Sequence, residues 1–197
     1  MRYGVEHKEK TRQRVLAEAG KAIRAEGPHK VGVAEVMARA GLTHGGFYAH
    51  FSSKDDLVIA AVDRMFEEGR ERMLREIGDR RPAQALAGYI DFYLSSAHRD
   101  ARTTGCPLPF LSADAPRLTG PAQERFASGI RQLSEGLAGQ LRLLGHADAE
   151  AEAASMLSEL VGALSLARAE PDSSRSDAIL ERSRGSLKKR LGLEASI

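Results

Sequence analysis

The chain has 197 residues, of which 42% are hydrophobic, so it can bury a sizeable core in one compact unit or in two small units that share a core. No apolar run reaches membrane-spanning length, and no signal-peptide pattern is present, so we expect a soluble, cytoplasmic protein without a membrane partner. Cys106 is the only cysteine, which excludes an internal disulfide and fits a reducing compartment.

The charges are divided unevenly along the chain. Residues 1–54 contain ten Lys or Arg and five Glu, a net charge of +5, whereas the remaining residues contain 19 basic and 22 acidic side chains, a net charge of −3. A basic head on a mildly acidic body is expected when one end of a protein meets a polyanion such as DNA. The alternative, an ordinary solvated helix surface, accounts for the same charges.

Hydrophobic periodicity predicts three helices within the first fifty or so residues. The apolar positions of the first helix share one face: Val15, Leu16, Ala19, Ala22 and Ile23. Gly27 and Pro28 end this helix, since Gly can adopt a left-handed cap and Pro cannot continue a helix. The second helix covers residues 33–40 and ends at Gly41, and Thr43 caps a third helix that reaches about residue 51.

The pattern predicts a long fourth helix from Ser53 to about Ile77. Ser52 and Ser53 are each followed three residues later by an Asp, which is a doubled capping pattern. The length of this helix suits a connector that begins in the N-terminal head and ends in the body.

The rest of the chain also favours helices. They are predicted from Pro82, from Pro121 to Gly145, from Asp148 to about Ala169, and after the turn at residues 171–174. The stretch 99–120 is predicted to be irregular, because it is rich in Gly and Pro. Since Ala, Leu, Glu and Arg dominate the composition and strand-favouring runs are scarce, we predict an all-α protein of about nine helices.

The second and third predicted helices are joined by a tight turn at Gly41, as in a helix-turn-helix. The third helix would then present its first turn to the major groove of DNA; this turn consists of Thr43, His44, Gly45 and Gly46. Each Gly inside a helix costs about 1 kcal/mol relative to Ala, so we interpret Gly45 as allowing close approach of the backbone to DNA. For Gly46, packing against the first helix is an equally acceptable explanation.

Three side chains that follow can donate hydrogen bonds to phosphate oxygens, namely Tyr48, His50 and Lys54. For Tyr48 the alternative is a partly buried ring whose hydroxyl lies in water. Phe47 and Phe51 are four residues apart, hence on one face, and we expect both in the core.

The segment from Val33 to Leu57, VAEVMARAGLTHGGFYAHFSSKDDL, resembles the DNA-binding domain of the TetR family of regulators. The likeness rests on the pattern A-G-L-T-x-G-x-F-Y-x-H-F-x-S-K-x-x-L, and the remaining helices agree with the family only in number and order. The resemblance implies an N-terminal three-helix DNA-binding domain at residues 1–54. It also implies a larger helical domain for effector binding and dimerisation at residues 55–197, with the helix from Ser53 as the connection.

The resemblance also implies residue roles in DNA binding. Residues that match His44 and Gly45 reach base edges in this family, and the phosphate contacts match Thr43, Tyr48, His50 and Lys54. Many relatives have a further phosphate-binding Thr at the start of the second helix. Val31 and Gly32 occupy that region here, so we expect Lys30 or Arg39 to provide the contact.

By the same resemblance, the protein is expected to be a homodimer through its last two helices and to act as a transcriptional repressor, with activation as an alternative. A small, largely apolar effector would release it from a palindromic double-stranded DNA operator. The candidate pocket residues are Met65, Phe66, Tyr89, Phe92, Tyr93, Cys106, Phe110, Phe126 and Met156. For each of them an ordinary place in the core is the alternative.

The sequence contains no metal-ligand spacing, no phosphate-binding Gly loop and no nucleophile motif, so we predict no enzyme activity, cofactor or metal. A helical adaptor whose basic head binds acidic protein remains an alternative, and it would ignore DNA sequence. Cys106 has no Lys or His adjacent in sequence to lower its pKa, so we expect an inert thiol and not an oxidant sensor.

Overall fold

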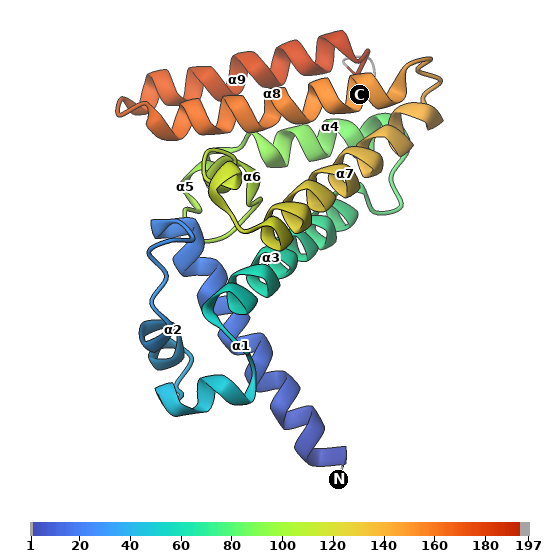
Figure 1. Cartoon of the computed structure of the whole chain (residues 1–197). Helices are drawn as coiled ribbons and strands as arrows, with labels where there is room; N and C mark the ends of the chain where they lie inside the picture. The colour runs from blue at the N-terminus through green and yellow to red at the C-terminus, as the bar shows by residue number, and fades with distance from the viewer. Residues whose placement is uncertain (1, 194–197) are drawn as a thin grey trace. The chain divides into compact units, whose positions relative to one another are not determined.

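The computed structural model describes residues 2–193, which form the helices α1 to α9 and the 3₁₀ helices η1 and η2, with no strand in that range (Figure 1). The prediction of an all-α fold is therefore confirmed. Within the same range, no helix is both long enough and apolar enough to cross a lipid bilayer.

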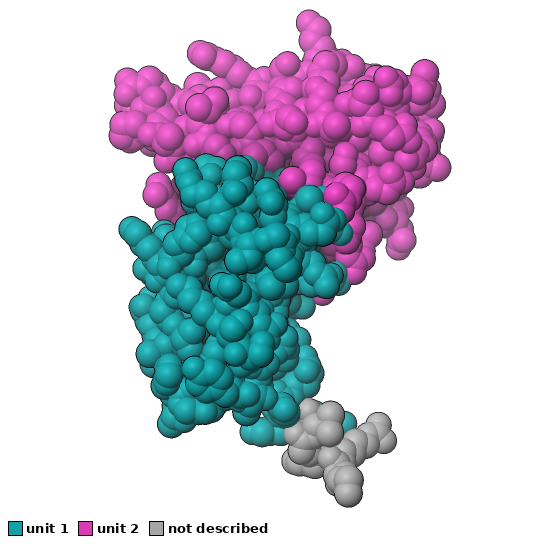
Figure 2. All heavy atoms as spheres, in the orientation of Figure 1, with its two compact units in different colours: residues 1–67, 103–129 teal, residues 68–102, 130–197 magenta. Residues whose placement is uncertain are grey.

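Contacts between residues divide the chain into two compact units, which Figure 2 shows in different colours. Unit 1 consists of residues 1–67 and 103–129, and unit 2 consists of residues 68–102 and 130–197. The boundary that we predicted after Lys54 thus lies inside unit 1. The functional division at this residue stays a prediction, because compactness alone does not define what a domain binds.

Unit 1 holds the N-terminal helices and a later segment of the chain. Its elements are α1 (Arg2–Glu26), α2 (Val33–Arg39), η1 (His44–Ala49), the first part of α3 (Lys54–Ile77), α6 (Leu108–Leu111), η2 (Ala115–Arg117) and the first part of α7 (Gly120–Leu143). α2 packs against α1 and η1, and α6 packs against α1. The predicted apolar face of the first helix is buried throughout, which confirms that interpretation.

The third predicted helix forms, but as the 3₁₀ helix η1 and not as an α-helix. Thr43 occupies the N-cap position, yet its side chain makes no capping hydrogen bond within residues 2–193. The physical reason is length and composition: a six-residue segment with two glycines is weakly helical, and 3₁₀ geometry is common in such short pieces.

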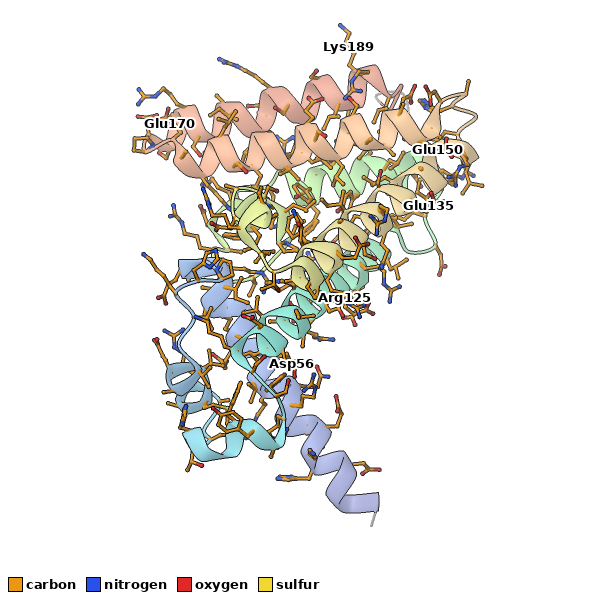
Figure 3. All side chains as sticks on the ribbon, in the orientation of Figure 1. Asp56, Arg125, Glu135, Glu150, Glu170 and Lys189 are labelled. Atoms are coloured by element: carbon orange, nitrogen blue, oxygen red, sulfur yellow. The ribbon has the colours of Figure 1, made fainter. Side chains whose placement is uncertain are left out.

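The start of α3 follows the predicted capping pattern in one of its two forms. The hydroxyl of Ser53 accepts a hydrogen bond from the backbone N–H of Asp56 at 3.0 Å. The carboxylate of Asp56 in turn accepts from the backbone N–H of Ser52 at 3.0 Å and from its hydroxyl at 3.2 Å. Asp56, labelled in Figure 3, therefore fixes the turn that leads from η1 into α3.

Unit 2 contains the later parts of α3 and α7 together with α4 (Pro82–Tyr93), α5 (Ser96–Asp100), α8 (Ala149–Ala169) and α9 (Ser173–Arg190). α8 and α9 lie side by side, and α4 packs against both of them (Figure 1). The stretch 99–120, which we predicted to be irregular, contains α6 and η2. Each has a Pro in its first turn, a position where the missing N–H costs no hydrogen bond.

A buried polar cluster ties α5, α8 and α9 together. Ser176 donates a hydrogen bond to the carbonyl of Ala167 at 2.7 Å and accepts one from Arg99 at 2.9 Å. Arg168 donates to the carbonyls of Arg99 at 3.0 Å and His98 at 2.9 Å. Because these groups are buried or half-buried, each hydrogen bond also satisfies a polar group that would otherwise be costly to remove from water.

The imidazole of His98 is the most deeply buried titratable group of this cluster. It is only 4% exposed, and its ring stacks on Phe92 with centroids 5.1 Å apart. Its Nδ1 lies 2.9 Å from the carbonyl oxygen of Tyr93, so Nδ1 carries the proton and donates it there. Burial lowers the pKa of His98 to about 4, the Tyr93 carbonyl opposes this shift, and the charges of Arg168 and Arg72 add to it.

α7 approaches α3 closely at Gly129. A Cβ atom at this position would lie 2.2 Å from Cγ and 2.3 Å from Cδ1 of Phe66, far inside van der Waals contact. Phe66 in turn contacts Phe126 edge to face, with ring centroids 5.3 Å apart. The absence of a side chain at Gly129 is therefore what makes room for the Phe66 ring.

We predict that Gly129→Ala lowers the free energy of unfolding by about 1–3 kcal/mol, because the extra methyl group forces Phe66 out of its position. Urea unfolding measures this. Gly139→Ala is the matched control in the same helix, since no heavy atom among the described residues lies within 4 Å of the place that its methyl group would take. That variant should gain about 0.5–1 kcal/mol. Equal stabilities of the two variants would contradict the assigned contact.

We predict that the free energy of unfolding falls as the pH drops from 6.5 toward 4, by about 3 kcal/mol from His98 alone. The sign follows because the unfolded chain binds a proton near pH 6.5, whereas the folded chain resists it until about pH 4. In His98→Asn this contribution should be missing, while the carboxylates still titrate. Parallel pH profiles for the two proteins, measured by urea unfolding, would contradict the assignment.

Candidate nucleic-acid interface

The turn between α2 and η1 is held by backbone hydrogen bonds. Gly41 has φ +69°, a left-handed conformation that favours Gly. Its N–H donates to the carbonyl of Ala38, and the N–H of Leu42 donates to the carbonyl of Met37, both at 2.9 Å. These two bonds form a Schellman motif, which closes the end of α2 and sets the direction in which η1 begins.

η1 has an apolar side and an exposed polar side. Phe47 and Phe51 are each only 2% exposed and stack with ring centroids 5.6 Å apart, which confirms that both belong to the core. On the other side Thr43 and His44 are exposed, and Tyr48 is 71% exposed with its ring edge against Phe47. The partly buried alternative for Tyr48 is therefore wrong. The buried phenylalanine pair fixes which side of η1 faces outward.

The two glycines of η1 differ in their surroundings. A Cβ atom at Gly45 would have no heavy atom of the described residues within 4 Å. At Gly46 it would lie at ordinary contact distances, 3.7 Å from the Met37 side chain and 3.8 Å from the Thr43 hydroxyl. Packing among the described residues requires neither glycine. The cost of Gly45 in a helical segment thus has no internal explanation among the described residues, which supports its interpretation as a point of close approach.

His50 follows η1 and is half-buried. Its carbonyl accepts a hydrogen bond from Arg12 of α1, and the Arg12 guanidinium lies over the Phe51 ring, 4.2 Å from the centroid. The imidazole Nδ1 is buried and finds no hydrogen-bond partner among the described residues. Burial and then the charges of Lys8 and Arg12 lower the pKa of His50, with Glu9 acting in the opposite direction.

The remaining predicted basic residues surround this surface unequally. Lys54, at the start of α3, is exposed and donates a hydrogen bond to the carbonyl of His29 at 2.9 Å. Lys30 is exposed in the loop before α2. Arg39 already pairs with Glu35 at 2.6 Å and lies 3.8 Å from Glu26. Because Arg39 is already held by these two carboxylates, Lys30 is the better candidate to replace the phosphate contact of the missing Thr.

Two basic residues of α1 that were not among the predicted site residues, Lys8 and Arg12, act on the end of η1. The sequence does carry a signal, because residues four apart on a helix lie on one side. What it does not show is that this side of α1 meets the end of η1, since His50 is 38 residues away from Arg12. Only the packing of the helices places them together.

The candidate effector residues do not gather in one unit. Met65, Phe66, Cys106, Phe110 and Phe126 belong to unit 1, and Tyr89, Phe92, Tyr93 and Met156 belong to unit 2. In unit 2 the ring of Tyr89 lies 5.8 Å from that of Tyr93 and 6.3 Å from that of Phe92. Phe92 and Phe110 are half-buried, and the other seven residues are buried. Cys106 is 6% exposed, and this burial favours an inert thiol.

Unit 1 also contains a small open cavity of about 190 Å³, formed by the loop after α1, the start of α3 and the segment around η2. Its lining residues are Pro28, His29, Lys54, Asp55, Val58, Arg117, Leu118 and Thr119. Of the predicted residues only Lys54 belongs to it, and Lys54 was predicted for DNA. The cavity is thus separate from the predicted effector residues.

Comparisons with known proteins agree with this geometry. Residues 15–61 match the model of the family described as "Bacterial regulatory proteins, tetR family". The chain is 24% identical over 105 residues to the uncharacterized HTH-type transcriptional regulator YfiR of Bacillus subtilis (strain 168), a match that covers 53% of this chain. The match spans 51% of that protein, about half of its length.

Solved structures with similar folds cover nearly all of the chain. The crystal structure of a TetR transcriptional regulator from Chloroflexus aurantiacus J-10-fl has a TM-score of 0.81 at 25% identity and covers 95% of this chain and 96% of its own. The reduced form of E. coli NemR has a TM-score of 0.79 at 21% identity and covers 91% of this chain and 97% of its own. The likeness to NemR shows the fold alone.

We predict that Gly45→Ala leaves the free energy of unfolding unchanged or slightly higher, because its methyl group enters open space. The same variant should bind duplex DNA more weakly, because the methyl group would separate η1 from the groove. Urea unfolding and fluorescence anisotropy with a labelled duplex measure the two effects. Gly139→Ala controls for the substitution itself. Wild-type affinity in a stable Gly45→Ala protein would refute the close-approach interpretation.

Proposed function

We propose that this chain is a sequence-specific, DNA-binding transcriptional regulator of the TetR type that represses genes from a palindromic operator, because residues 15–61 match the model of that family and the whole fold resembles that of a TetR transcriptional regulator. The observation that carries the proposal is the exposed polar side of η1, which the Schellman turn and the buried phenylalanine pair hold outward. A helix-turn-helix reads DNA with such a segment in the major groove. The family and the fold are those of regulators and not of enzymes.

The proposed contacts divide into base readout and phosphate positioning. His44 reads base edges, and Gly45 lets the backbone approach them. Thr43, Tyr48 and His50 bind phosphates along η1, where Thr43 and Tyr48 are exposed. Lys54 binds a phosphate at the start of α3, and Lys30 or Arg39 provides the contact beside α2. Because Gly45 has no side chain, sequence choice depends on His44 and on residues outside η1.

Dimerisation through α8 and α9 would supply the second half-site. The first half of α8 keeps an exposed stripe of small side chains at spacings of three and four residues, formed by Ala151, Ala154, Ser155 and Ser158, and Ala169 is exposed at the end of the helix. Leu166 on the same helix is 63% exposed, although α9 packs alongside. Small residues let a second helix approach closely, and covering Leu166 removes apolar surface from water. A second copy of this chain is the proposed occupant of this surface.

Release by a small effector is the second half of the proposal. A largely apolar molecule would bind among the aromatic and Met side chains of the candidate pocket. α3 contributes residues to both units, so it is the element through which binding would change the spacing of the DNA-binding heads. The effector must bind the DNA-free arrangement more tightly than the DNA-bound one, since equal affinities would shift nothing. The proposed location is the cytoplasm, where a bacterial operator lies.

Selection of bound sequences from a random pool of duplexes tests the function. We expect the purified protein to enrich one palindromic site whose half-sites lie one helical turn or a multiple of it apart. His44→Ala should relax the preference for that site, because it removes base contacts but no phosphate contact. Enrichment of no site at any salt concentration would overturn the proposal and favour the adaptor alternative.

A further inference from the structure

We propose that the first turns of α1 are part of the DNA interface, with Lys8 binding a backbone phosphate beside η1 and Arg12 holding the end of η1 in its DNA-binding position. This inference rests on the proposed function and extends it to an element outside the helix-turn-helix. The occupant is the phosphodiester backbone of duplex DNA.

The first step concerns the position of Lys8 on α1. Lys8 lies seven residues, or two helical turns, before Val15, so both side chains are on the same side of the helix. Val15 is fully buried in unit 1, whereas residues 6–10 are all exposed. Figure 1 shows the first turns of α1 continuing beyond α2 and η1. Lys8 thus lies on the core-facing side of α1, at a level where there is no core left to cover.

The second step concerns Arg12, which links α1 to the end of η1. Its guanidinium donates a hydrogen bond to the carbonyl of His50 and lies over the Phe51 ring at 4.2 Å. A planar guanidinium can make both contacts at once, which a lysine ammonium does less well. Since η1 is short and contains two glycines, it depends on such outside contacts to keep its position. Arg12 is therefore a positioning residue.

The third step concerns charge. Lys8 and Arg12 act together on His50, and both disfavour its protonated form, while Glu9 partly offsets them. The ammonium of Lys8 and the guanidinium of Arg12, which contacts His50 and Phe51, thus bring two positive charges to the end of η1. Positive groups brought together at a surface are stabilised by a shared anion. The surface is continuous with the proposed groove contacts, so the anion that reaches it when η1 lies in the groove is a DNA phosphate.

The test compares Lys8→Gln with Lys10→Gln in the full-length protein. The two substitutions remove the same charge from exposed positions of the same helix, about 200° apart around its axis. Affinities for the selected site and for a random duplex of equal length are measured against salt concentration. Lys8→Gln should weaken binding to both duplexes and lower the salt slope by about one for each subunit bound. Lys10→Gln should leave the slope unchanged, and Lys54→Gln serves as the positive control.

Arg12 needs a readout that a merely structural role would not change. Arg12→Lys keeps the charge, so its salt slope should stay that of the wild type. Its preference for the selected site over the random duplex should fall several-fold at a temperature where the variant is fully folded. Thermal unfolding establishes that temperature, and Arg12→Gln repeats the measurement without the charge. An unchanged preference in folded Arg12→Lys and Arg12→Gln would overturn the positioning role.

The outcomes separate this inference from the proposed function. A wild-type protein that selects a site, with equal salt slopes for Lys8→Gln and Lys10→Gln, overturns the inference alone. A wild-type protein that selects no site overturns the proposed function. In that case, a lower salt slope for Lys8→Gln on the random duplex would still show that α1 contacts a phosphate. An unchanged salt slope would show that Lys8 makes no phosphate contact.

Discussion

The stacked rings of Phe47 and Phe51 are the contact on which the proposed interface depends. Both rings are buried, and they lie on one side of a segment that has little helical stability of its own. Their burial anchors the segment and at the same time determines that Thr43, His44 and Tyr48 lie on the outside. A hydrophobic contact thereby fixes the direction of polar side chains that make few contacts themselves.

The two glycines of η1 lower the stability of this helix but leave its backbone accessible. An α-helix of good helix formers would be more stable by about 1 kcal/mol for each glycine replaced, but it would place side chains where the backbone is now open. The missing stability comes from neighbours: the Schellman turn at Gly41, the capping contact between Ser53 and Asp56, and Arg12 across the end of the segment. All three act at the ends of η1, which leaves Thr43, His44 and Tyr48 exposed among the described residues.

Unit 2 uses polar groups in a different way. The cluster around His98, Ser176 and Arg168 lies inside, where a hydrogen bond has a strict geometry and a missing partner is costly. Such a cluster specifies how α5, α8 and α9 meet, whereas the apolar contacts between them would tolerate small shifts. The exposed side of α8, which includes Leu166, is the surface that we propose for a second copy of the chain.

The sequence by itself determined the helices and the direction of η1. Periodic apolar residues, Gly at helix ends and Ser-Asp caps are local signals, so the bounds of α3 and α8, the start of α4 and the burial of Phe47 and Phe51 could be predicted without coordinates. The last helix was predicted after a turn at residues 171–174, but α9 already begins at Ser173, because Asp172 caps it. The resemblance of the segment from Val33 to Leu57 to the TetR family likewise predicted which residues of η1 contact DNA, and these include the exposed Thr43, His44 and Tyr48.

The tertiary structure decided what depends on distant parts of the chain. Arg12 meets His50 across 38 residues, Arg99 meets Ser176 across 77, and the segment 103–129 joins the N-terminal helices in unit 1. It also decided the separation of the candidate effector residues between two units. The reason is physical: a helix is specified by neighbours three and four residues away, whereas the partner of an exposed charge or a buried ring is chosen by packing, which no local pattern records.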